Sequence, residues 1–77
     1  MARHTKQAVN INKAVAIGKA QQLGYSMFGY RVANSAHVMI VMSGGGMRNI
    51  KITVSSSADV PARKIEKDVQ DKHNLYN

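Results

Sequence analysis

Hydrophobic and polar residues alternate along the middle of the chain, and this pattern predicts three β-strands. The clearest segment is "NIKITV", in which every second residue is apolar: Ile50, Ile52 and Val54. "AHVMIVM" before it is rich in β-branched residues and methionine, and "YSMFGYRVA" is rich in aromatic residues. The dipeptide "NS" separates these two segments and "SGGG" leads into the third, so both breaks predict turns. Reading the aromatic segment as a loop instead would leave two strands.

A first helix is predicted before the strands. It is capped by Asn10 or Asn12, runs to about Leu23 and is ended by Gly24. Its apolar residues form two stripes, so the pattern does not decide which side faces the core. One stripe holds Ile11, Ala14, Val15 and Gly18, and the other holds Ala16, Ala20 and Leu23.

A second helix is predicted after the strands. The serines at 55–57 and Asp59 offer caps, Pro61 suits a first helical turn, and the helix runs to about His73. At 100° per residue, one side of this helix is mainly apolar and the opposite side is basic. The apolar side holds Ala62, Ile65, Val69 and Tyr76, and the basic side holds Arg63, Lys64 and Lys67.

Together these elements predict an α+β fold. The order is α-β-β-β-α, with a three-stranded antiparallel sheet and two helices packed on one of its faces. Residues 1–9 are expected to form a basic flexible tail, and residues 10–77 a single compact domain.

The face occupied by His37 depends on the turn before it. A three-residue turn pairs His37 with Ala33, on the face of Arg31, whereas a two-residue turn moves it to the face of Val32. We favour the three-residue turn, because it directs the apolar residues of the second and third strands toward the helices. His37 then lies on the open face of the sheet, near Arg31 and Lys51.

The charge of the chain is unevenly distributed. The net charge is +7, and residues 1–58 contain no Asp or Glu, while residues 59–77 contain four acidic and four basic side chains. A surface that carries only positive side chains favours a polyanionic partner, whose counterions are released on binding. Nucleic acid is therefore the expected partner.

The residue inventory excludes several classes of protein. There is no Cys, the three His have no metal-ligand spacing, and the acids lie on or just before the second predicted helix. We therefore expect no disulfide, metal or cofactor, no two-carboxylate chemistry and no Ser-His-Asp triad. The longest apolar run, Val38 to Met42, is far shorter than a membrane span of about 20 residues. We expect a cytoplasmic protein that does not enter a membrane.

One reaction suits a histidine among cations. RNA carries its own nucleophile, the 2′-hydroxyl, so cleavage needs a base to take its proton and positive charge to stabilise the phosphorane. His37 is the candidate base. The candidate RNA-binding residues are Arg31, Lys51, Arg63, Lys64 and Lys67.

The order of motifs resembles the HicA family of small toxin ribonucleases. "LGY" at Leu23–Tyr25 matches a helix end followed by an aromatic, "NSAH" at Asn34–His37 matches a Gly-Ser-x-His segment, and "ADVPARKIEKDV" matches the last helix. The likeness spans about residues 10–72, with Asn34 where the family usually has Gly. It implies a double-stranded-RNA-binding-like fold, mRNA endonuclease activity with His37 as general base, and a neutralising antitoxin partner.

Two other functions fit the same sequence. A noncatalytic module similar to a double-stranded-RNA-binding domain would use the basic start of the last helix. A small inhibitor of another protein would use an exposed strand edge or a surface formed by Met39, Met42 and Met47, although we expect these methionines to fill the core instead. The core of so short a chain is small, so self-association as a homodimer is also expected to help stability.

Overall fold

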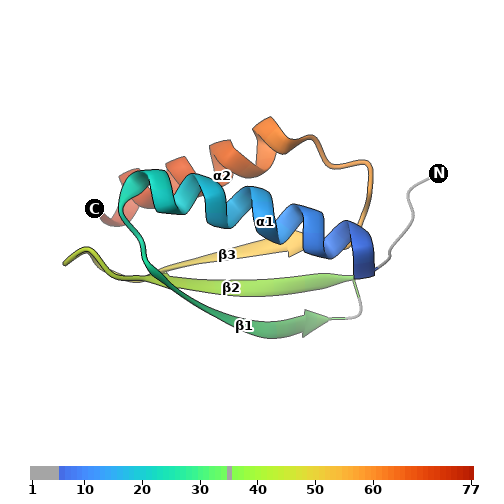
Figure 1. Cartoon of the computed structure of the whole chain (residues 1–77), viewed down its shortest axis with the longest axis horizontal. Coiled ribbons are helices and arrows are strands. Elements are labelled where there is room, and N and C mark those ends of the chain that lie inside the picture. Colours follow the sequence, from blue (N-terminus) through green and yellow to red (C-terminus); the bar gives the residue numbers. More distant parts are fainter. Residues whose placement is uncertain (1–5, 35) are drawn as a thin grey trace.

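The chain folds as an α+β structure with the expected order of elements. The computed structural model describes residues 6–34 and 36–77. A three-stranded antiparallel sheet of order β1-β2-β3 carries both helices on one face (Figure 1). The elements are α1 (Lys6–Leu23), β1 (Met27–Asn34), β2 (His37–Ser43), β3 (Ile50–Ser55) and α2 (Ala62–Tyr76). The fold class predicted from the hydrophobic pattern is thus confirmed.

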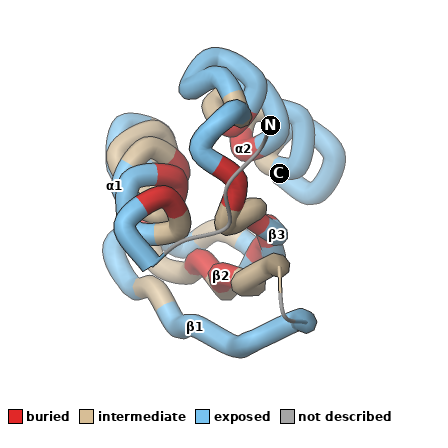
Figure 2. The backbone as a smooth tube through the Cα atoms, turned by 90° about the vertical axis from the view of Figure 1, so that its right-hand side faces the viewer, coloured by how far each residue is buried: buried red, intermediate tan, exposed pale blue. Residues whose placement is uncertain are grey.

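The core lies between the sheet and the helices. The buried strand residues are those that the alternation directs toward the helices: Ile40, Met42, Ile50, Ile52 and Val54. They pack against small residues of α1, Ala16 and Ala20, and against Ile65 and Val69 of α2. Figure 2 shows this buried layer between sheet and helices, with most of β1 outside it. No helix among residues 6–34 and 36–77 covers the opposite face of the sheet (Figure 1).

Helix α1 begins earlier than the sequence predicts. It starts at Lys6 rather than at Asn10 or Asn12, and Ala8 in its first turns is buried. Residues 6–9 therefore belong to the helix and not to a flexible tail, and residues 1–5 of that predicted tail lie outside the described part. Asn12 does not cap the helix, because its side chain is buried and donates to the carbonyls of Ser55 at 2.7 Å and Ser57 at 3.0 Å.

The turn between β1 and β2 differs from the expected one. His37 pairs with Asn34 rather than Ala33, and a bulge between Val32 and Asn34 restores the pairing of Val32 with Val38. Because the bulge adds one residue, Arg31 still pairs with Met39 and shares the face of His37. The expected face of His37 is therefore correct, although the expected pairing is wrong. Ser35 of this turn lies outside the described residues.

The glycines between β2 and β3 form the predicted turn. Gly44, Gly45 and Gly46 all have positive φ, the conformation that other residues rarely adopt. At Gly45 a Cβ atom would lie only 2.6 Å from the carbonyl oxygen of Gly24, which follows α1. The absence of a side chain at Gly45 therefore lets the turn pack against the end of the first helix.

Helix α2 is longer than predicted and less apolar on its inner side. Pro61 is the extended residue just before the helix, without a side-chain cap, and the helix continues past His73 to Tyr76. The serines instead stabilise the chain reversal after β3, where Ser57 Oγ accepts from the Asp59 N–H at 3.2 Å. Of the four residues assigned to the inner side, Ile65 and Val69 are buried, whereas Ala62 and Tyr76 are exposed.

A polar network joins the ends of both helices to the turn after β2. The buried Tyr25 hydroxyl lies 3.0 Å from Nδ1 of His73 and accepts from the Asn77 amide at 2.9 Å. Asn77 Oδ1 also accepts from the Arg48 N–H at 2.8 Å. Burial raises the pKa of the Tyr25 phenol, and the hydrogen bond from Asn77 partly opposes this rise.

Across residues 6–34 and 36–77, neither helix has the length and apolar character needed to cross a membrane.

Candidate functional site

His37 is the first residue of β2 and lies on the open side of the sheet. Ile40 and Met42 of the same strand are buried against the helices, so the odd-numbered His37, Met39 and Val41 point the other way. His37 pairs with Ser55 of β3, and its side chain is half-buried. The imidazole thus stands at the end of the sheet where β3 leads toward α2.

The side chain of Asn34 fixes the orientation of this imidazole. Asn34 Oδ1 accepts a hydrogen bond from the Ala36 N–H at 2.9 Å and lies 3.0 Å from His37 Nδ1. The backbone N–H can only donate, so the atom that it contacts is the amide oxygen, and the oxygen can only accept from the imidazole. When the His37 imidazole is neutral, its proton therefore lies on Nδ1, and the lone pair on Nε2 is free to accept a proton.

His37 lines a groove of about 160 Å³ along the outer edge of β3. Thr53 and Ser55 contribute from the strand, and Lys64 and Asp68 contribute from α2. Lys64 and Asp68 are four residues apart, which places them one above the other on the side of the helix nearest β3. Residues that carry an imidazole, an ammonium, a carboxylate and hydroxyl groups therefore line one groove.

The presence of Asp68 corrects an expectation from the sequence. We expected the histidine to lie among cations, without a carboxylate beside it; Asp68 is exposed, as most of the acids were expected to be. Asp68 instead lines the His37 groove, because it flanks the buried stripe formed by Ile65 and Val69. Lys64 flanks the same stripe. The helical projection predicted that it lies on the side opposite the core, and this prediction is wrong.

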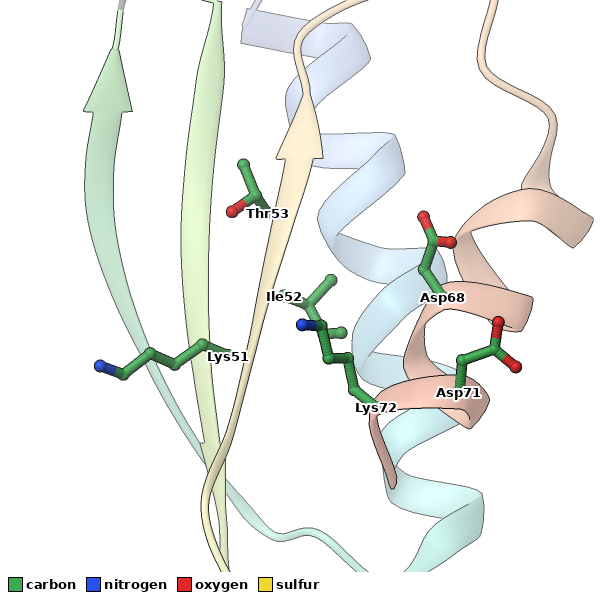
Figure 3. Close-up of a pocket in the computed structure, with 6 residues that line it drawn as sticks. All are labelled: Lys51, Ile52, Thr53, Asp68, Asp71 and Lys72. Atoms are coloured by element: carbon green, nitrogen blue, oxygen red, sulfur yellow. The ribbon is translucent and has the colours of Figure 1, made fainter. Parts of the chain in front are cut away.

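A second and larger groove continues along the same edge of β3. Its volume is about 440 Å³, and its lining residues are drawn in Figure 3: Lys51, Ile52, Thr53, Asp68, Asp71 and Lys72. The Lys51 side chain extends from β3 away from α2, whereas Asp68 and Asp71 project from the helix (Figure 3). Ile52, Thr53 and Asp68 line both grooves, so the two are continuous.

The remaining predicted binding residues are spread over two surfaces. Arg31 is exposed on the open face of the sheet, two pairs away from His37. Arg63 and Lys67 are exposed on α2 beside Lys64. Lys67 forms an exposed ion pair with Asp71 at 2.9 Å, and the pKa of its ammonium is raised by this hydrogen bond and by the nearby negative charge. Of the five predicted cations, Lys64 alone lines the groove of His37.

Sequence reasoning did not assign Asn34 or Asp68 to this site, and of these two residues only Asn34 had a local signal. An Asn side chain often accepts from the N–H two residues further on, so Asn34 could have been assigned this turn from the sequence alone. Asp68 had no such signal, because its place depends on how α2 lies against β3.

No protein-family model matches the chain, and neither curated proteins nor solved structures show a significant match. The function is therefore argued from the site.

Proposed function

We propose that this protein binds RNA in the cytoplasm and cleaves it without a metal ion, with His37 as the general base. The observation that carries the proposal is the contact between Asn34 and His37, since in the neutral imidazole it holds the proton on Nδ1 and leaves Nε2 as the proton acceptor. A general base has to begin in this form. The resemblance of residues 10–72 to HicA ribonucleases supports the same role, and with it an antitoxin-like protein partner.

The chemistry uses groups that share the His37 groove. Nε2 takes the proton from a ribose 2′-hydroxyl, the 2′-oxygen bonds to the adjacent phosphorus, and the bond from phosphorus to the 5′-oxygen breaks. The departing 5′-oxygen takes a proton from water. The Lys64 ammonium supplies positive charge near the phosphate, and Arg63 and Lys67 extend this charge along α2. The products are a 2′,3′-cyclic phosphate and a free 5′-hydroxyl.

Binding without cleavage is a second candidate, and Asp68 favours it. A carboxylate in the groove of His37 repels the phosphate that the reaction would bring there. Arg63 and Lys67 lie outside that groove, so α2 can contact RNA phosphates even if nothing enters it. In this form the protein would resemble a double-stranded-RNA-binding module, which reads phosphates and 2′-hydroxyls by shape.

One incubation separates the two candidates. End-labelled single-stranded and hairpin RNAs are mixed with the protein in EDTA, alongside His37→Ala and the control Met39→Ala, which changes the same open face two residues away. Cleavage by the parent and the control, reduced about 100-fold or more in His37→Ala, supports the enzyme. RNA with a 2′-deoxy sugar at the cut site should resist. Tight, salt-sensitive binding with intact RNA would exclude cleavage and leave the binding module.

A further inference from the structure

Strand β1 is an exposed edge, and Lys13 of α1 reaches it with its ammonium 4.7 Å from the centre of the Tyr30 ring. Apart from the half-buried Phe28, each residue of Met27–Asn34 is exposed. Three apolar side chains are largely exposed: Val32 at 81%, Met27 at 66% and Tyr30 at 51%. Figure 2 shows β1 exposed along most of its length at the rim of the sheet. Strand edges in soluble proteins are normally blocked by charges, proline or a covering element, and β1 carries one charged residue, Arg31.

The backbone of β1 presents unpaired groups along this edge. The Ser56 N–H donates to the Ala36 carbonyl at 2.8 Å, so residues 36 and 56 form a hydrogen-bonded pair. Such pairs occur at every second position of an antiparallel ladder, so the even residues of β2 bond to β3 and the odd ones to β1. Met39 and Val41 thus bond to Arg31 and Gly29. The N–H and C=O groups of Phe28, Tyr30 and Val32 therefore point outward.

The other edge of the sheet is occupied in part. On β3 the same alternation turns the backbone of Lys51, Thr53 and Ser55 outward. The Ser55 carbonyl already accepts from Asn12, and side chains of α2 line the grooves beside Lys51 and Thr53. Of the two edges, β1 is the one at which the described part of the chain leaves a run of outward groups uncovered.

We propose that β1 pairs antiparallel with β1 of a second copy, with a two-fold axis at Tyr30. Residues 27–33 of each strand then face the same residues of the partner in reverse order. Tyr30 pairs with Tyr30 of the partner subunit, and Phe28 with the partner's Val32. Pairs between aromatic residues, and between an aromatic and a β-branched residue, are among those that stabilise adjacent strands. A two-fold axis requires that the same surface serves both copies, and this register satisfies it.

Charge and overlap select this register over its neighbours. A two-fold axis at Arg31 would place two guanidinium groups directly opposite, where like charges destabilise a strand pair. An axis at Gly29 would leave Val32 and Ala33 of both strands without partners in β1. With the axis at Tyr30, Arg31 faces the partner's Gly29, which has no side chain to obstruct it.

The dimer joins two sheets into one and has a consequence for the open face. Cross-strand partners share a face, so all helices lie on one side and both open faces on the other. Among the described residues of this open face the ionisable groups are His37, Arg31 and Lys51, and none is acidic. Pairing through β1 therefore doubles a cationic surface. The dimer does not depend on RNA cleavage.

The absence of Cys from the chain allows a direct test of the register. Single cysteines are placed at positions 29, 30, 31 and 32, and each variant is treated with oxidised glutathione as the oxidant. Paired residues have Cα atoms about 5.5 Å apart, within the range that a disulfide spans. Tyr30→Cys should give a covalent dimer. Val32→Cys should not, because the two copies of residue 32 are four positions apart along the strands, roughly 13 Å.

Two further measurements complete the test. Light scattering on the untreated parent should give the mass of a dimer, and Tyr30→Lys, which sets two ammonium groups opposite each other, should give a monomer. Thr53→Lys adds the same charge at the other edge and should remain dimeric. Circular dichroism confirms that each variant is folded. A monomeric parent at 100 µM or so, dimers unaffected by Tyr30→Lys, or fastest cross-linking at position 29, 31 or 32 would each overturn the proposal.

Discussion

The Asn34 side-chain oxygen lies 3.0 Å from Nδ1 of His37 and at the same time holds the Ala36 N–H at 2.9 Å. Two donors thus converge on one oxygen. A three-residue segment of turn therefore sets both the path of the backbone into β2 and the position of the imidazole proton.

Asn34→Ala should lower cleavage by about 10- to 100-fold, the scale of loss when a catalytic group is misplaced. Without the acceptor, the imidazole proton is free to move to Nε2 and the ring to turn. Asn34→Asp keeps an oxygen acceptor and should restore most of the rate. Nitrogen chemical shifts of the His37 ring report the position of the proton independently of activity. Equal rates and unchanged ring shifts in Asn34→Ala would show that Asn34 has no positioning role.

Replacing Arg63, Lys64 and Lys67 together by Gln should weaken RNA binding at low salt. Each lost phosphate contact lowers the slope of log affinity against log salt by about 0.7 for single-stranded RNA, so three contacts predict a change of roughly 2. Arg48→Gln, in the turn at the other end of the sheet, is the control and should bind as the parent does. Fluorescence anisotropy from low to physiological salt measures both. An unchanged slope would place the binding surface elsewhere.

Asn12→Ala should lower the free energy of unfolding by about 2 kcal/mol. The substitution removes the amide that donates to the backbone carbonyls of Ser55 and Ser57. For a domain of this size, this loss of stability corresponds to a fall in Tm of roughly 8–16 °C. Asn10→Ala removes an exposed amide from the same helix and should change stability by no more than about 0.5 kcal/mol. Thermal unfolding followed by circular dichroism compares the two. Similar Tm values would contradict the role of the Asn12 contacts.

Stability should fall as the pH rises above about 10, and Tyr25 should account for part of the fall. Burial raises the pKa of its phenol in the folded state, so between the unfolded and folded pKa the unfolded chain releases a proton that the folded chain keeps. Tyr25→Phe should flatten this dependence, while lowering stability at neutral pH through loss of the bonds to His73 and Asn77. Denaturant unfolding between pH 7 and 11 measures both effects.

The Lys67 ammonium acts in the same direction, since its hydrogen bond to Asp71 raises its pKa. The Lys67→Gln variant is therefore compared with the double variant Lys67→Gln, Tyr25→Phe. The difference between their losses of stability with pH is the contribution of the Tyr25 phenol. If the two proteins lost stability equally between pH 10 and 11, the buried phenol would not contribute.

Local patterns predicted those parts of the fold that depend on neighbours in sequence. The alternation of Ile50, Ile52 and Val54 fixed a strand and its buried face, and Gly24 marked the end of α1. The start of α1 was missed because Ala8 is held by tertiary packing, which propensity does not report. Asn12 looked like a cap because its partners lie more than forty residues away.

In the candidate site, too, the features set by neighbours in sequence were predictable and those set by tertiary packing were not. The face of His37 followed from the apolar residues of its own strand, and the Asn34 turn is local to the segment that contains it. That Lys64 and Asp68 share the groove of His37 depends on the angle at which α2 crosses β3. No periodicity within α2 specifies that angle.

The contacts of Asn12 also set an order of events during synthesis. The carbonyls that accept from it belong to residues 43 and 45 positions later in the chain. In proteins most of the stability of a helix comes from tertiary packing, and the apolar side of α1 has no sheet to cover until β2 and β3 exist. We therefore expect α1 to become stable only after residue 57 has been added, in one late folding step. The helix that is made first is among the last to become stable.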